Sequence, residues 1–146
     1  MDKPTRILVV DDDENVITPI EAILKSEGYA VDVARSGSEA IKKSENAAYN
    51  LALIDIRLPD MDGTELLTRM KDRIPKVRKI ILTGYPSMQN AISAVNKKAD
   101  AYVVKPVDLD KLLELIREQL KLQENEKKYS ELKVAEFIEA RVKEIA

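Results

Sequence analysis

Five short apolar runs, each followed by an amphipathic segment, constrain the fold of this 146-residue chain more than any other feature. The runs have the length of strands and are mostly rich in Val, Ile and Leu, and three of them are nearly continuous in apolar residues, as expected for strands covered on both faces. They cover residues 7–10, 29–34, 51–54, 79–83 and 101–104. Five strand-then-helix units predict an α/β fold with a parallel sheet and right-handed crossovers.

The segments between the runs carry helical signals. Apolar residues between Val16 and Leu24 follow the spacing of a buried helix face, and Gly28 is placed to end that helix. Pro19 inside it is expected to perturb one turn. Residues suited to cap the later helices are Ser36, in a capping-box pattern with Glu39, then Ser87 and Asp108.

The last 40 residues, after Pro106, contain no Gly or Pro. A continuous helix there would be about 60 Å long and would project beyond the domain. Since residues 123–128 include no apolar side chain, the expected division is a domain over residues 1–122 and a helical extension over 123–146. The extension is interpreted as an interaction or dimerisation helix or as a linker to an output domain outside this chain, and the alternative is a frayed solvated helix.

Composition excludes several classes of function. The chain has 26 acidic and 24 basic residues, so it has no broad basic field and is not expected to bind nucleic acid directly. No apolar stretch is long enough to cross a bilayer and the first residues do not resemble a signal peptide, so we expect a cytoplasmic protein without membrane contact. The chain contains neither Cys nor His, so any phosphohistidine in its chemistry belongs to another molecule.

Polar residues follow four of the five runs. In an open parallel sheet, ligands bind beyond the carboxyl ends of the strands, where these residues would meet. Crowded carboxylates favour a hard cation, and a lysine and a hydroxyl beside them suit a phosphoryl group. Taken singly, each has a plainer role, and Asp13 is better explained as a helix cap. The residues in question are Asp11 to Asp13, Asp55, Thr83 and Lys105.

The stretch from Asp55 to Gly63 offers two candidate nucleophiles. Its "DMDGT" is similar to the nucleophile motif of haloacid-dehalogenase-type phosphatases, which would assign the reaction to Asp60. However, Asp60 follows Leu58 and Pro59, and proline disrupts a central strand. The buried run ends at Asp55, so Asp55 is the preferred candidate, with Asp60 and Asp62 as solvated or capping residues.

Over residues 5 to about 122, the chain resembles the receiver domain of two-component response regulators. The motifs that carry the resemblance are "ILVVDDD", "LALIDIRLPDMDG", "LTGYPS" and "AYVVKP", in that order and with similar separations. The resemblance implies a doubly wound five-stranded sheet of order 2-1-3-4-5, the flavodoxin-like order, with helices on both faces.

The resemblance also implies a role for each acidic residue of the site. Asp55 would be the phosphoacceptor, and Asp11 and Asp12 would hold Mg²⁺ or Mn²⁺. A carboxylate oxygen of Asp55 and the backbone carbonyl of Arg57 would complete the protein ligands.

Further residues would respond to the phosphoryl group. Thr83 would hydrogen-bond to it and Lys105 would pair with it, with a cis bond between Lys105 and Pro106. Tyr102 matches the switch aromatic residue that turns inward when the threonine moves. Arg57 and Tyr85 stand at positions that vary in the family, and we expect them to shield the phosphoryl group and slow its hydrolysis.

The implied function is that of a signalling switch. A sensor histidine kinase would donate the phosphoryl group, the face formed by the fourth helix, fifth strand and fifth helix would change, and hydrolysis of the acyl phosphate would reset the protein. The alternatives are a receiver that acts only by binding other proteins and a module that dimerises through its linker helix. A homodimer would form through that face or through the C-terminal helix.

Overall fold

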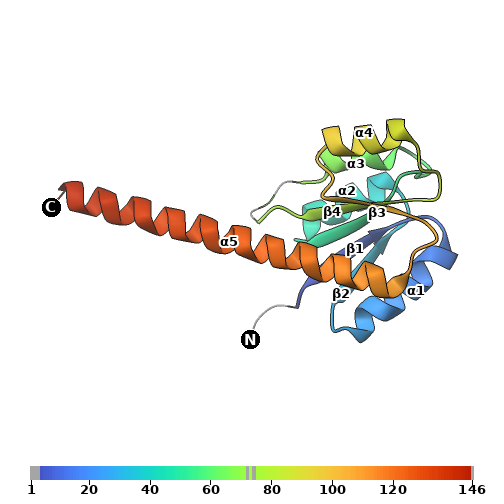
Figure 1. Cartoon of the computed structure of the whole chain (residues 1–146), viewed down its shortest axis with the longest axis horizontal. Coiled ribbons are helices and arrows are strands. Elements are labelled where there is room, and N and C mark those ends of the chain that lie inside the picture. The colour runs from blue at the N-terminus through green and yellow to red at the C-terminus, as the bar shows by residue number, and fades with distance from the viewer. Residues whose placement is uncertain (1–3, 72, 74, 146) are drawn as a thin grey trace.

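The computed structural model describes residues 4–71, 73 and 75–145, and it contains all five predicted strands, each within one residue of its predicted ends (Figure 1). All strand pairs are parallel and the order in the sheet is β2-β1-β3-β4-β5, which confirms the predicted topology. The strands are β1 (Arg6–Val10), β2 (Ala30–Ala34), β3 (Leu51–Asp55), β4 (Arg78–Thr83) and β5 (Ala101–Val104).

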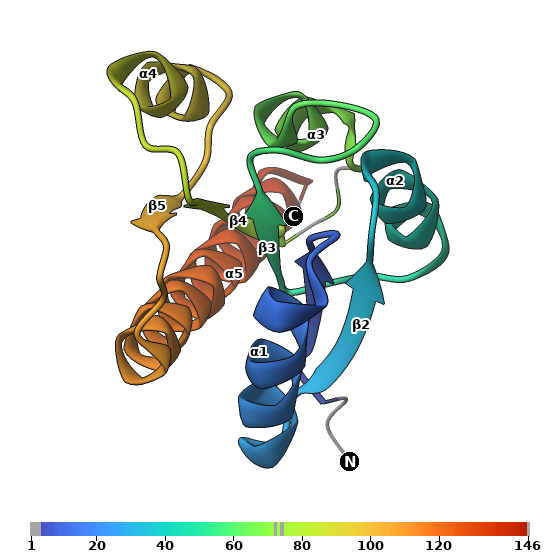
Figure 2. The ribbon, with the colours of Figure 1, turned by 90° about the vertical axis from the view of Figure 1, so that its right-hand side faces the viewer.

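Helices cover both faces of this sheet. Figure 2 shows α1 and α5 on one face and α2, α3 and α4 on the other. Successive side chains of a strand point to opposite faces, so Ile7 packs in the core beneath α1 and α5, whereas Leu8 packs in the core beneath the other three helices. The helices are α1 (Glu14–Ser26), α2 (Gly37–Asn46), α3 (Gly63–Arg69), α4 (Met88–Asn96) and α5 (Leu109–Ile145).

Side-chain caps begin the helices. Each capping side chain accepts a hydrogen bond from a backbone N–H two or three residues later, which satisfies one of the free donors of the first turn. Gly28 follows the end of α1 with a φ of 89°, as expected for a residue that stops a helix. Pro19 lies on the exposed side of α1, and the helix continues through it. The caps are Asp13, Ser36, Asp62, Ser87 and Asp108.

Helix α5 has 37 residues, is therefore about 56 Å long and projects far beyond the sheet (Figure 1). Polar contacts fix its direction. The buried Gln123 side chain donates hydrogen bonds to the carbonyls of Asn50, at 2.8 Å, and Lys76, at 2.7 Å. Arg78, at the start of β4, pairs with Glu126 at 2.9 Å. Contacts between the helix and the domain therefore extend past residue 122, where the sequence predicted the end of the domain.

Beyond these contacts, α5 exposes apolar side chains, each more than half accessible to solvent: Tyr129, Leu132, Val134, Phe137 and Ile138. In the sequence, Val142 and Ile145 continue the helical spacing of Val134 and Ile138, but their side chains lie outside the described part of the chain. Among the described residues, no helix combines the length and the apolar character that a bilayer span needs.

Candidate functional site

Three carboxylates meet at the carboxyl end of the sheet. Because β1 and β3 are parallel neighbours with Val10 opposite Ile54, the residues that follow, Asp11 and Asp55, emerge side by side. Each of Asp11, Asp12 and Asp55 places a carboxylate oxygen within 4.8 Å of the other two. Asp11 and Asp55 are buried, and Asp12 is exposed at the mouth of the site. The structure therefore brings the predicted acidic residues together.

Lys105 supplies the positive charge of this site. Its Nζ lies 2.9 Å from Asp11 Oδ2 and 3.3 Å from Asp55 Oδ1. It comes directly after β5, and its backbone N–H donates a hydrogen bond to the carbonyl of Thr83. The peptide bond between Lys105 and Pro106 is cis, as expected from the resemblance.

The site keeps more negative charge than Lys105 can neutralise. Burial raises the pKa of Asp55, and the charge of Asp11 raises it further, against the opposing effect of Lys105. Burial by itself would lower the pKa of Lys105, but its hydrogen bond with Asp11 and the charges of Asp11 and Asp55 outweigh burial and raise it. Clustered carboxylate oxygens are the donors that hard divalent cations prefer, so this site fits such a cation.

Three more of the predicted site residues lie at the end of β4 or on the loops that follow β3 and β4. Thr83 is buried at the end of β4, and its Oγ1 accepts a hydrogen bond from the backbone N–H of Tyr85 at 3.0 Å. The guanidinium of Arg57 stacks on the ring of Tyr85, 3.8 Å from the ring centre. The structure thus joins the two residues that the sequence suggested for control of phosphorylation lifetime.

Tyr102 in β5 packs against the core beneath α2, α3 and α4. Its hydroxyl oxygen is buried and has no hydrogen-bond partner among the described residues. A buried hydroxyl without a partner carries an uncompensated desolvation cost. A change of structure that gives this hydroxyl a partner, or moves it to solvent, would therefore lower the free energy.

Asp60 and Asp62 do not reach the acidic cluster. Asp62 caps α3, the helix that begins at the next residue. Asp60 is exposed and accepts hydrogen bonds from the backbone N–H groups of Gly37 and Ser38, at the start of α2. The structure therefore gives no support to Asp60 as a nucleophile. Its role on α2 cannot be recognised in the sequence, because no local pattern marks a cap contributed from a distant segment.

Comparisons with known proteins agree with this geometry. Residues 7–117 match the family model of the response regulator receiver domain. The chain is 40% identical over 114 residues to the transcriptional regulatory protein ZraR of Klebsiella oxytoca, covering 78% of this chain and 26% of that protein. The chain thus spans about a quarter of the length of this curated relative.

Solved structures give the same result. A CheY-like response regulator receiver domain protein from Methanospirillum hungatei JF-1 is 47% identical, with a TM-score of 0.81 over 85% of this chain and 99% of the other. A response regulator from Burkholderia pseudomallei, solved with a phosphorylated aspartic acid, calcium ion and citrate, is 28% identical, with a TM-score of 0.70 over 84% of this chain and 72% of the other.

Proposed function

Since this chain belongs to the response regulator receiver domains of two-component systems, we propose that it accepts a phosphoryl group on Asp55 and acts as a timed signalling switch. The observation that carries the proposal is the meeting of Asp55 with Asp11, Asp12 and Lys105 at the carboxyl end of the sheet. The solved relative with a phosphorylated aspartic acid supports the same chemistry.

In the proposed reaction, a carboxylate oxygen of Asp55 forms a bond to phosphorus while the bond from phosphorus to the imidazole of a partner phosphohistidine breaks. The electron pair of the broken bond stays on the imidazole. Lys105, already 3.3 Å from Asp55, is placed to neutralise charge on the phosphoryl oxygens. The donor is a sensor histidine kinase, which supplies the histidine that this chain lacks, and both act in the cytoplasm.

Asp11, Asp12, one oxygen of Asp55 and the backbone carbonyl of Arg57 would hold Mg²⁺ or Mn²⁺. When bound, the ion supplies positive charge that offsets the negative charge of the phosphoryl group. The exposure of Asp12 at the mouth of the cluster, beside two buried carboxylates, supports this assignment.

The switch would run through Thr83 and Tyr102. Thr83 Oγ1 already accepts the N–H of Tyr85, and its hydroxyl proton is available to donate to a phosphoryl oxygen. Tyr102, with its unpaired buried hydroxyl, would respond to that movement. The exposed apolar side chains on α4 and β5 support the face formed by α4, β5 and α5 as the surface that changes: Met88, Ile92, Val95 and Val104. Attack by water on the acyl phosphate would end the signal.

Incubation with acetyl phosphate and Mg²⁺, followed by measurement of the intact mass, tests this proposal. We expect a single phosphoryl adduct that is absent from Asp55→Asn. Asp60→Asn removes the rival candidate nucleophile, which lies outside the cluster, and with Mg²⁺ in large excess it should still form the adduct. Absence of an adduct in the unmodified chain would favour a receiver that acts only by binding.

Dimerisation through α5 is a second candidate function, favoured by the exposed apolar side chains beyond Glu126. Sedimentation velocity of the whole chain and of a chain without residues 131–146 tests it. This truncation leaves Gln123 and Glu126, and hence the anchored part of the helix, in place. A concentration-dependent dimer that disappears on truncation supports this function, and a monomer in both cases excludes it.

A further inference from the structure

The loop between β3 and α3, residues 56–62, fits closely around the phosphoacceptor. Leu58 N–H bonds to the carbonyl of Met61 at 3.2 Å, and Gly63 N–H bonds to the carbonyl of Ile56 at 2.7 Å. A Cβ atom at Gly63 would overlap the backbone of Asp55, so the start of α3 touches the residue that ends β3. A displacement of this loop would therefore act directly on Asp55 and on Arg57, which the loop carries.

Asp60 fastens the outer side of this loop to α2. Its Oδ1 accepts the N–H of Gly37 at 2.7 Å and its Oδ2 accepts the N–H of Ser38 at 2.9 Å. These bonds from Ser38 and Gly37 lower the pKa of Asp60, and its negative charge is favourable at a helix N-terminus. The Met61 side chain lies directly over Gly37, so it too packs the loop against the start of α2.

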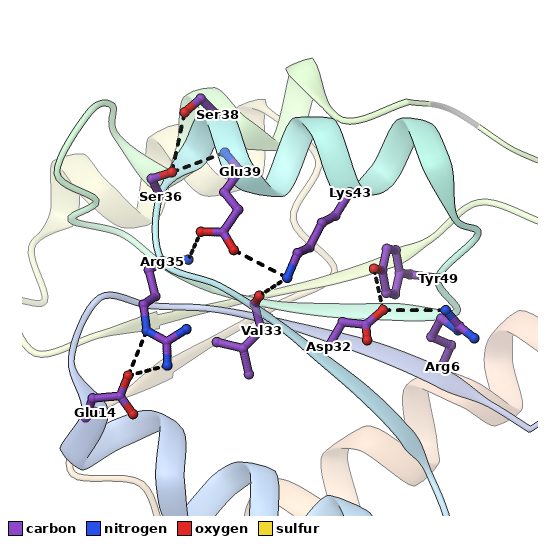
Figure 3. A network of polar contacts seen from close by, with 10 residues as sticks. All are labelled: Arg6, Glu14, Asp32, Val33, Arg35, Ser36, Ser38, Glu39, Lys43 and Tyr49. Carbon is purple, nitrogen blue, oxygen red and sulfur yellow. Dashed lines mark hydrogen bonds and ion pairs between the residues drawn. The ribbon is translucent and has the colours of Figure 1, made fainter.

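The part of α2 that Asp60 holds is itself fixed on its other side (Figure 3). Ser36 caps the helix through the N–H of Glu39 at 3.1 Å, and Glu39 in turn accepts the backbone N–H of Arg35 at 3.0 Å. The Arg35 guanidinium pairs with Glu14, in the first turn of α1. The first turn of α2 therefore connects the loop after β3 to α1, the helix that follows Asp11 and Asp12.

These two connections differ in strength. The pair of Arg35 and Glu14 is exposed on both sides, and such pairs contribute little to stability. Asp60 instead accepts two hydrogen bonds from backbone N–H groups. Because the helix holds these groups in place, they cannot move with the loop. Of the two connections, the one through Asp60 is therefore the stronger, and it is the one that reaches the loop.

We propose that Asp60 is a positioning residue, which holds the loop at residues 56–62 against α2 and thereby sets the place of Asp55 and the Arg57 carbonyl relative to Asp11 and Asp12. The proposal rests on the proposed function of the acidic cluster as a metal and phosphoryl site. Asp60 itself touches none of the reacting groups.

Two substitutions at the start of α2 separate positioning from simple support of the helix. Asp60→Ala removes both bonds between the loop and α2. Ser36→Ala removes a cap from the same helix but has no bond to the loop, so it serves as the matched control. Asp60→Asn keeps one acceptor oxygen and should give an intermediate result, and it remains informative if Asp60→Ala folds poorly.

Hydrogen exchange of the metal-free protein gives the first readout. We expect faster exchange of the amides of residues 56–63 in Asp60→Ala, and unchanged exchange there in Ser36→Ala, whose effect should stay within α2. Unchanged exchange in Asp60→Ala, or equal increases in both variants, would overturn the proposal.

Affinity for Mg²⁺, measured by calorimetric titration without a phosphodonor, gives the second readout. Asp60→Ala should bind Mg²⁺ about tenfold more weakly, the lower end of what loss of an outer support costs a metal site. Ser36→Ala should bind like the unmodified chain, and an equal loss in the two variants would contradict positioning by Asp60. If the unmodified chain binds Mg²⁺ but forms no phosphoryl adduct, the proposed function fails while both readouts still decide the role of Asp60. If it does not bind Mg²⁺, the positioning proposal fails with the metal site.

Discussion

At the scale of single residues, Asp55 and Asp60 show how the surroundings of a side chain decide its role. They stand five positions apart in one stretch of sequence. Burial and the charge of Asp11 raise the pKa of Asp55, whereas backbone hydrogen bonds from Ser38 and Gly37 lower that of Asp60. Ionisation of Asp55 thus costs the fold stability, which suits a group that takes up a ligand, whereas ionisation of Asp60 stabilises the fold.

These opposite shifts predict opposite effects of replacing each aspartate by asparagine. A raised pKa means that stability is lost as pH rises through the range where Asp55 ionises, so Asp55→Asn should increase the free energy of unfolding at neutral pH. A lowered pKa means that stability is present above the ordinary carboxyl range and is lost as pH falls, so Asp60→Asn should decrease it at neutral pH.

Urea denaturation with a chelator present, from about pH 7 to about pH 4, measures both differences. Each should shrink toward the acidic end, where carboxylates take up protons in the folded and unfolded chain alike. A decrease in stability on Asp55→Asn at neutral pH would contradict the electrostatic description of the cluster.

The stacked pair of Arg57 and Tyr85 makes a prediction about signal lifetime. Exposed cation–π contacts contribute about 0.5–1 kcal/mol, so Tyr85→Ala should speed loss of the phosphoryl group by a factor of about 2 to 5 if the stack shields Asp55. Tyr129→Ala is the matched control, since Tyr129 is equally exposed and carries Lys133 over its ring, but lies on the extension. Intact-mass measurement over time gives the rate at which each variant loses the adduct. Equal rates in Tyr85→Ala and Tyr129→Ala would contradict shielding.

At the scale of secondary-structure elements, Gln123 is the residue that ties α5 to the sheet. Gln123→Ala leaves the carbonyls of Asn50 and Lys76 without this donor, which should lower the free energy of unfolding by about 1–3 kcal/mol. Glu124→Ala, at the exposed neighbouring position, should change it by less than about 0.5 kcal/mol. Chemical denaturation of the two variants side by side measures the difference, and equal values would show that Gln123 does not anchor the helix.

Most elements follow from local sequence, and the exceptions depend on tertiary contacts. The strands were predicted to within one residue because their apolar runs are bounded by polar residues, and parallel topology then placed Asp11, Asp55 and Lys105 at one edge. Gln123 was not recognised, since it lies in a run without apolar residues and is buried only because α5 passes the starts of β3 and β4. The cap that Asp60 gives to α2 joins segments more than 20 residues apart, so no periodicity reports it.

At the scale of the whole molecule, the anchored and free parts of α5 should be separable. The described side chains from Glu131 to Arg141 are all exposed, so removal of residues 131–146 should change the free energy of unfolding of the domain by less than about 0.5 kcal/mol. Urea denaturation at a low protein concentration, where a dimer would dissociate, provides the measurement. A larger loss would mean that the extension folds back onto the domain in solution.

The uninterrupted course of α5 also has a mechanical consequence. Because no Gly or Pro occurs between Leu109 and Ile145, the helix contains no hinge, and the contacts of Gln123 and Arg78 act as its fulcrum. The free arm beyond Glu126 is about 28 Å long, so a tilt of about 10° at the fulcrum would move its far end by about 5 Å. The arm between Leu109 and Gln123 is about 21 Å long, so this tilt corresponds to a shift of about 4 Å at the Leu109 end, beside the carboxyl ends of the strands. A rearrangement of that size next to the site would therefore reach the tip of the arm undiminished.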